Sequence, residues 1–232
     1  IVERNLVKFN QFEIAKEYIL YRARREEVRD QEHEEYVKKF ETQTLQVTKR
    51  NGESERFDIK KIKQTYDRIA SGYEEFCPFH DIVEALKDSV VDHMATKDIA
   101  KLLIKIMIDM ISVENIHWQV LAGRLIIIDL YKQAAKNRNI SIEWIYSGDN
   151  YKALFDLYIE EGKYYKDFYK HYSEDDIRKA WEHISKTQDF EYSYTTSLML
   201  ANRYLLNPIK IVKELPQEMY MSIALFLAIP EP

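Results

Sequence analysis

A cluster of basic side chains near residue 50 is the strongest candidate for chemistry in this sequence. Residues 45–63 carry a local charge of +3 in a chain whose net charge is −5. Lys60 and Lys61 fall in the first turn of a predicted helix, where cations oppose the helix dipole. A bound anion would reverse that penalty, because a helix start also offers free N–H donors. The alternative is a basic face that only contacts solvent. The basic residues are Lys49, Arg50, Arg56, Lys60, Lys61 and Lys63, and the acidic ones are Glu53, Glu55 and Asp58.

The other ligating and nucleophilic residues form weaker patterns. Glu114 and His117 make a single Glu-x-x-His, whereas carboxylate-bridged metal sites need two such pairs and further glutamates. His33 lacks the second histidine of a metalloprotease motif, and no glycine-rich phosphate loop is present. The one cysteine, Cys77, excludes an intramolecular disulfide and a Cys-rich zinc module, and it suits a reducing compartment. We therefore predict neither a metal site nor a catalytic residue in this sequence.

Composition limits the class of protein. The 232 residues are 46% hydrophobic and 31% charged, which is typical of one large or two small globular domains. Five glycines and five prolines leave too few turns for an all-β sandwich or barrel. The negative net charge favours neither nucleic acid nor a membrane surface, and the longest apolar run, 223–229, is too short to span a bilayer. Because the chain lacks an initiator Met and a closing element, we expect a piece of a longer protein.

Apolar periodicity predicts a mainly helical chain with one hairpin. Helical spacing covers 12–29, and the charged segment 30–44 follows as a linker or helix extension. Alternation over 45–57 around an Asn-Gly pair predicts a β-hairpin. Four helices then follow, over 59–69 with Gly72 at its end, over 81–94, from Thr96, and after Asn115. Residues 144–194 hold fourteen aromatic side chains and more acidic than basic residues, so we predict a helical core of packed rings.

Several of these segments resemble a known family. The run LQVTKRNGESERFDIKKI at 45–62 resembles the opening of an ATP-cone, the nucleotide-sensing module of ribonucleotide reductases. The likeness continues through TKDI at 96–99 and WQVLAGRL at 118–125. Three later runs are similar to the helical segment before the catalytic barrel of the reductase large subunit: YSEDD at 172–176, FEYSY at 190–194 and RYLL at 203–206. The run PQEMYM at 216–221 is similar to the start of the next helix.

The resemblance implies a domain order. Residues 1–29 would be the C-terminal remnant of an upstream ATP-cone, because AKEYILYR at 15–22 is similar to a cone's last helix. Residues 30–44 would be a linker. Residues 45–137 would be an intact ATP-cone, with a small hairpin lid on a bundle of about four helices. Residues 138–232 would be the N-terminal helical domain that precedes a catalytic barrel.

The resemblance also implies an ATP or dATP site under the hairpin lid. Cations would neutralise the triphosphate, Glu55 would accept from the adenine amino group, and apolar side chains would sandwich the base. Thr96, at a helix start, would donate to phosphate. The family often has a histidine where this sequence has Ala100, which puts a phosphate or ribose contact in doubt. The implied contacts are Val47, Lys49, Arg50, Glu55, Lys61, Ile62, Thr96, Ile99 and Lys132.

The implied function is allosteric control of a cytoplasmic ribonucleotide reductase. ATP would activate and dATP inhibit, with magnesium on the triphosphate. The parent enzyme would be a homo-oligomer of large subunits that obtains its radical from a small subunit or from adenosylcobalamin. Its chemistry needs a radical cysteine and a redox pair, so this region should be inactive alone. Two alternatives remain. One is a cone-bearing transcriptional repressor, although such repressors carry a four-cysteine zinc ribbon before the cone and residues 1–44 contain no cysteine. The other is a structural helical module whose cone does not bind a nucleotide.

Overall fold

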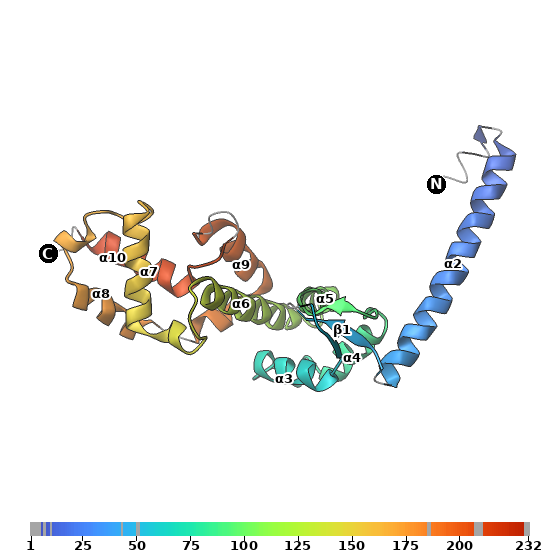
Figure 1. Ribbon diagram of the computed structural model, residues 1–232, viewed down its shortest axis with the longest axis horizontal. Helices are drawn as coiled ribbons and strands as arrows, with labels where there is room; N and C mark the ends of the chain where they lie inside the picture. Colours follow the sequence, from blue (N-terminus) through green and yellow to red (C-terminus); the bar gives the residue numbers. More distant parts are fainter. Residues whose placement is uncertain are drawn as a thin grey trace. The chain divides into compact units, whose positions relative to one another are not determined.

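The computed structural model describes residues 6, 8–9, 11–42, 44–49, 52–184, 187–206 and 211–229 (Figure 1). The chain divides into two compact units. The first comprises Ile1–Tyr66 and Pro78–Ile106, and the second comprises Asp67–Cys77 and Met107–Pro232. Helices dominate both units, and the only sheet among the described residues is small. The predicted mainly α class is therefore confirmed.

A three-stranded sheet forms the centre of the first unit. Strands β1 (Gln46–Thr48) and β2 (Ser54–Arg56) pair antiparallel, which confirms the predicted hairpin. At its turn Gly52 has a φ of 87°, a conformation that favours glycine. Strand β3 (Met94–Ala95) lies on the other side of β1 and runs parallel to it. The sequence pattern did not predict this third strand.

Three helices follow the hairpin along the chain: α3 (Ile59–Ile69) and α4 (Phe79–Lys87) come before β3, and α5 (Thr96–Asp109) comes directly after it. The helix predicted over 81–94 is wrong at both ends, since α4 begins earlier and ends seven residues sooner. A turn follows at 88–89, and the chain then returns to the sheet, where the backbone N–H of His93 donates to the Gln46 carbonyl over 2.8 Å. His93 has a φ of 61°, which cannot continue a helix.

Helix α2 (Phe12–Glu41) precedes the hairpin and is longer than predicted. The segment 30–44, predicted as a linker or a helix extension, is helical as far as Glu41, which agrees with a helix extension. The rings of Phe40 and Phe57 lie 5.5 Å apart, which fixes the end of α2 beside the hairpin. The other domain boundaries proposed from the resemblance stay predictions.

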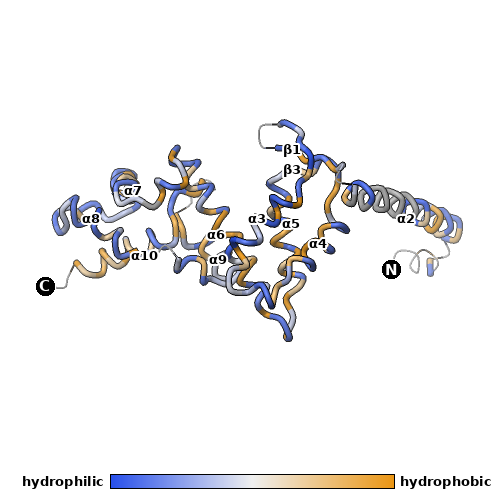
Figure 2. Tube along the Cα trace, turned by 90° about the horizontal axis from the view of Figure 1, so that it is seen from below, coloured by the Kyte–Doolittle hydropathy of each residue, from blue (hydrophilic) through white to orange (hydrophobic). Residues whose placement is uncertain are grey.

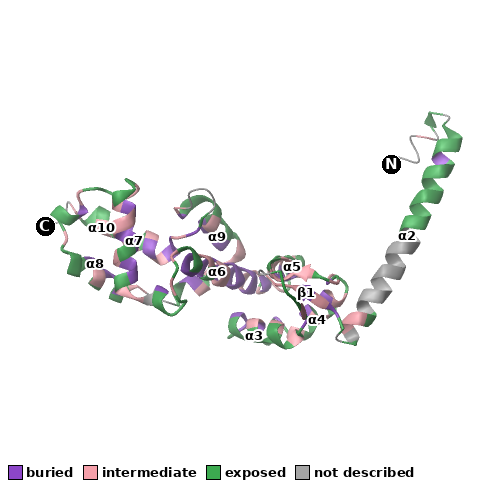
Figure 3. Cartoon of the chain, in the orientation of Figure 1, coloured by how far each residue is buried: buried purple, intermediate pink, exposed green. Residues whose placement is uncertain are grey.

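Helix α6 (Trp118–Asn137) is the central element of the second unit and is buried over most of its surface (Figure 3). Gly123 lets another segment approach closely: a Cβ there would lie 2.3 Å from the carbonyl oxygen of Tyr192. The buried guanidinium of Arg124 donates to the carbonyls of Ile69, Ser71 and Phe190 over 2.8 to 2.9 Å. The bonds to Ile69 and Ser71 satisfy carbonyls at and just after the end of α3, which a helix terminus leaves free.

Short helices packed on aromatic rings complete the second unit. Tyr151, Phe155, Phe168 and Trp181 form its core together with Ile177, which confirms the predicted ring packing. No described helix is both long and apolar enough to cross a membrane. The elements are a 3-10 turn (Trp144–Tyr146), α7 (Gly148–Glu160), a 3-10 turn (Phe168–Lys170), α8 (Glu174–Ala180), 3-10 turns (Trp181–His183 and Gln188–Glu191), α9 (Tyr194–Met199), a π-helical turn (Leu200–Tyr204) and α10 (Pro216–Ala228).

Candidate functional site

The hairpin gathers three of the predicted nucleotide contacts. Val47 and Glu55 are directly opposite in the antiparallel register, so their side chains leave the sheet on the same side. Lys49 follows β1 two residues after Val47 and alternates onto that side as well. Val47 is buried, whereas Lys49 and Glu55 are half-buried. The apolar side chain of Val47 therefore lies on the same side of the sheet as the charged side chains of Lys49 and Glu55.

Glu55 bridges two lysines that were both predicted to bind phosphate. Its Oε2 lies 3.0 Å from Nζ of Lys49, and its Oε1 lies 2.9 Å from Nζ of Lys61 on α3. The bonds from Lys61 and then Lys49 lower the pKa of Glu55, and the bond to Glu55 raises the pKa of Lys49. Both shifts favour the charged forms of Glu55 and Lys49. One carboxylate thus lies between two lysines, and the three side chains have a formal charge of +1.

The start of α3 places Lys61 and Ile62 beside the hairpin. Asp58 caps this helix, because its Oδ1 accepts from the backbone N–H of Lys60 over 2.9 Å. Lys61 is exposed and reaches back to Glu55, whereas Ile62 is half-buried. The cap therefore fixes the helix turn that carries both predicted contacts.

The start of α5 adds Thr96 and Ile99. Thr96 is the first residue of α5 and follows β3 directly, and Thr48 of β1 pairs with Ala95. The parallel pairing thus brings the free N–H groups of the α5 N-terminus close to the end of β1. Ile99 is buried, and Ala100, where the family often has histidine, is half-buried.

Asp92 holds the segment before this helix start beside β1, a role that was not predicted from the sequence. Its Oδ1 accepts from the backbone N–H of Gln46 over 2.8 Å, and its Oδ2 lies 3.2 Å from Nζ of Lys39. The Gln46 bond is the largest cause of a lowered pKa of Asp92. No local signal marks Asp92, because its partners lie about fifty residues earlier in the chain.

Two predicted contacts are not among the described residues of the first unit. Arg50 lies outside the described residues. Lys132 is exposed on α6 in the second unit, where it lines a cavity of about 300 Å³ together with Arg68, Tyr131 and Phe190. The first unit therefore brings together seven of the nine predicted residues: Val47, Lys49, Glu55, Lys61, Ile62, Thr96 and Ile99.

The other candidate residues from the sequence, His117 and Cys77, lie in packing environments. The ring of His117 lies 4.4 Å from that of Phe76, and its backbone N–H donates to the Asn115 side chain over 3.2 Å. Cys77 is buried. Within the described part of the chain, no cluster of three or more His, Cys, Asp or Glu side chains could hold a metal ion.

The comparisons with known proteins define the class of this site. Residues 45–133 match the family model of the ATP cone domain. The chain is also 32% identical, over 79% of its length, to the ribonucleoside-diphosphate reductase subunit alpha of Helicobacter pylori. It is 26% identical over 99% of its length to subunit alpha of Treponema pallidum, and 29% identical over 71% of its length to subunit alpha of reductase 1 of Escherichia coli.

These findings confirm the resemblance on which the sequence analysis relied. The chain contains an ATP cone domain, and most of it is similar to the N-terminal region of ribonucleoside-diphosphate reductase alpha subunits. It spans about a fifth to a quarter of the length of those relatives, with coverage of 22%, 25% and 20% for the three named above.

Proposed function

We propose that this chain is the allosteric region of a ribonucleotide reductase alpha subunit and binds ATP or dATP at the ATP cone. The observation that carries the proposal is the Lys49–Glu55–Lys61 cluster beside buried Val47 and the start of α5. A triphosphate needs cations and N–H donors, and a base needs apolar contact. The first unit supplies all of these within one ATP cone fold.

Each residue has a distinct role in the proposed complex. Lys49 and Lys61 turn from Glu55 to the triphosphate, with Arg50 and Lys132 as further phosphate contacts. Glu55 then accepts from the adenine amino group, while Val47, Ile62 and Ile99 contact the base. Thr96 donates to phosphate, and magnesium accompanies the nucleotide. ATP and dATP differ by one hydroxyl, so their opposite effects require a coupling free energy between separate sites.

The wider proposal concerns the parent protein. It reduces ribonucleoside diphosphates to deoxyribonucleotides in the cytoplasm, as an oligomer of alpha subunits with a radical source on another subunit or a cofactor. Bound dATP changes how the subunits associate rather than contacting the substrate. The cone-bearing repressor is disfavoured, because the relatives reported above are reductases and the similarity to them extends beyond the ATP cone domain.

Calorimetric titration tests nucleotide binding. Wild-type chain should bind both ATP and dATP, and Lys49→Ala or Lys61→Ala should each weaken binding by about 10- to 150-fold, the scale of a hydrogen bond to a charged group. Lys179→Ala is the matched control, because Lys179 is similarly exposed and pairs with Asp175 over 2.6 Å. No heat with either nucleotide at millimolar concentration would refute the proposal and favour a structural module. Equal weakening by the control would refute the assigned roles.

A further inference from the structure

The end of α2 is bonded to the backbone that carries the proposed nucleotide site. Lys39, in the last turn of α2, places its Nζ 3.2 Å from Oδ2 of Asp92. The other carboxylate oxygen, Oδ1, accepts from the backbone N–H of Gln46 over 2.8 Å, where β1 begins. Figure 2 shows α2 and the strands meeting at this end of the helix. One carboxylate therefore joins a helix, a strand and the segment before β3.

The segment that Asp92 holds leads directly to the start of α5. The backbone N–H of His93 donates to the Gln46 carbonyl over 2.8 Å, and the His93 carbonyl accepts from the Thr48 hydroxyl over 3.1 Å. Strand β3 then runs beside β1, and Thr96 follows as the first residue of α5. The free N–H groups of this helix start are the proposed phosphate donors. Their position therefore depends on how Asp92 is held against β1.

The backbone beside Asp92 needs these bonds to keep its conformation. His93 has a φ of 61°, in the left-handed region that favours glycine. A residue with a side chain keeps such a conformation only where the surrounding structure holds it. The bonds of Asp92 and His93 to β1 supply that hold. Loss of the Asp92 carboxylate should therefore let the segment leave β1 and loosen the start of α5.

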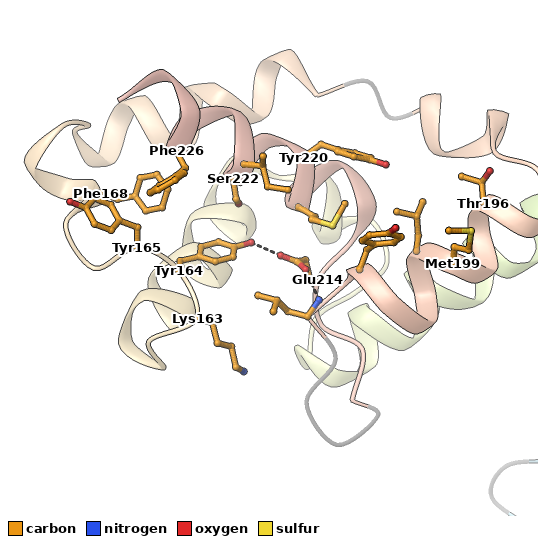
Figure 4. Close-up of a pocket in the computed structure, with 15 residues that line it drawn as sticks. Lys163, Tyr164, Tyr165, Phe168, Thr196, Met199, Glu214, Tyr220, Ser222 and Phe226 are labelled. Carbon is orange, nitrogen blue, oxygen red and sulfur yellow. Dashed lines mark hydrogen bonds between the residues drawn. The ribbon is translucent and has the colours of Figure 1, made fainter. Parts of the chain in front are cut away.

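An open cavity in the second unit offers no such connection to the proposed site. It has a volume of about 710 Å³, and all of its lining residues belong to that unit (Figure 4). The two polar side chains joined in this view already satisfy one another, because the Tyr164 hydroxyl donates to Oε1 of Glu214 over 2.5 Å. The α2 end is therefore the better candidate for a contact that regulates the proposed site.

We infer that Asp92 is a positioning residue for the nucleotide site and that its ion pair with Lys39 makes nucleotide affinity depend on α2. This inference rests on the proposed nucleotide binding. While α2 is docked, Lys39 holds Asp92 in place and the α5 start presents its N–H groups to phosphate. Undocking of α2 removes one partner of Asp92 and weakens that presentation. Since coupling between two sites is reciprocal, bound nucleotide also stabilises the docked α2.

Calorimetric ATP titrations of substituted chains test this coupling. Lys39→Met breaks the ion pair and keeps the length of the side chain. Asp92→Asn also breaks it but keeps an acceptor for the Gln46 N–H, whereas Asp92→Ala removes both contacts. Lys87→Met is the matched control, because Lys87 pairs with Glu84 over 2.9 Å and its side chain is 28% exposed, against 33% for Lys39. Far-UV circular dichroism checks that each variant is folded.

We expect Lys39→Met and Asp92→Asn each to weaken ATP binding by about 1.4- to 5-fold, the scale of one exposed ion pair. Asp92→Ala should weaken it by about 10-fold or more, within the range of typical allosteric coupling. Lys87→Met should have no effect, and Lys39→Met should add nothing in the Asp92→Asn background. In the wild-type chain, saturating ATP should slow hydrogen exchange of the Thr42 amide, which bonds to the Lys38 carbonyl at the end of α2.

Three results would overturn the inference while leaving nucleotide binding intact. They are wild-type affinity in Lys39→Met, an undiminished effect of Lys39→Met in the Asp92→Asn background, and Thr42 exchange that ATP does not change. A wild-type chain that binds no ATP would instead refute the proposed function, and the inference with it. If Asp92→Ala does not fold, the two milder variants decide the question.

Discussion

Replacing Glu55 by Gln separates two roles that this side chain combines. In the free chain Glu55 holds Lys49 and Lys61 at 3.0 and 2.9 Å, so it occupies the two ammonium groups that a triphosphate needs. In the proposed complex it also contacts adenine. Glu55→Gln removes the negative charge while keeping the size of the side chain. The charge of the three groups then rises from one to two.

The magnitude follows from the exposure of these groups. The side chains of Lys49, Glu55 and Lys61 are 40%, 25% and 58% exposed, so solvent weakens both ion pairs. One exposed pair shifts an equilibrium by about 1.4- to 5-fold, and two shift it by about 2- to 30-fold. Because tripolyphosphate has no base, its affinity should rise by that factor in Glu55→Gln. The preference for ATP over GTP should fall, because Glu55→Gln replaces the carboxylate that is proposed to accept a hydrogen bond from the adenine amino group.

Competition titrations with tripolyphosphate, ATP and GTP measure both effects. Glu84→Gln is the control, because Glu84 also pairs with a lysine, Lys87 at 2.9 Å on the same helix α4, and is not a predicted nucleotide contact. Tripolyphosphate binding that is unchanged or weaker in Glu55→Gln would show that Glu55 does not compete for the lysines. An unchanged preference for ATP would show that it does not contact adenine.

Three further predictions concern the rest of the chain. Gly123→Ala should destabilise the second unit by about 1–3 kcal/mol in urea unfolding, because its Cβ would lie 2.3 Å from the Tyr192 carbonyl oxygen; unchanged stability would contradict this close approach. Burial raises the pKa of Glu214, so its contribution to stability is full below the ordinary carboxyl pKa and is lost as pH rises through the raised value. Relative to wild type, Glu214→Gln should therefore become more stable as pH rises above the ordinary carboxyl pKa, and a stability difference independent of pH would be inconsistent with the shift. Residues 1–29 should bind no nucleotide, so calorimetric titration should give one ATP bound per chain. A stoichiometry of two ATP per chain would contradict this prediction.

Local patterns predicted the elements that depend on neighbouring residues. The hairpin follows from the turn at Gly52, and α3 follows from apolar spacing closed by Gly72, whose φ is 83°. Strand β3 has two residues and no alternation, so periodicity could not show it. Apolar residues continue at helical spacing beyond Lys87, where α4 ends, as far as Val90, and for this reason the predicted helix was too long. The bond from Gln46 to Asp92 holds the following segment beside β1, and no local window contains that contact.

The candidate site was predictable in its residues but not in its pairings. Residue types and the family resemblance predicted Lys49, Glu55 and Lys61 as nucleotide contacts, because charged residues near a hairpin and a helix start can be recognised in the sequence. Their mutual ion pairs depend on strand register and on the direction of α3, which only the fold defines. The resemblance assigned Glu55 to the base, whereas the structure places it on both lysines.

A structure of the chain determined with ATP, and again with dATP, tests the central claim most directly. The account predicts that triphosphate oxygens lie within hydrogen-bonding distance of Nζ of Lys49 and Lys61, with both lysines turned away from Glu55 and the base against Val47. The claim is contradicted if the nucleotide is held elsewhere in the chain, or if the two lysines remain on Glu55 at saturating nucleotide.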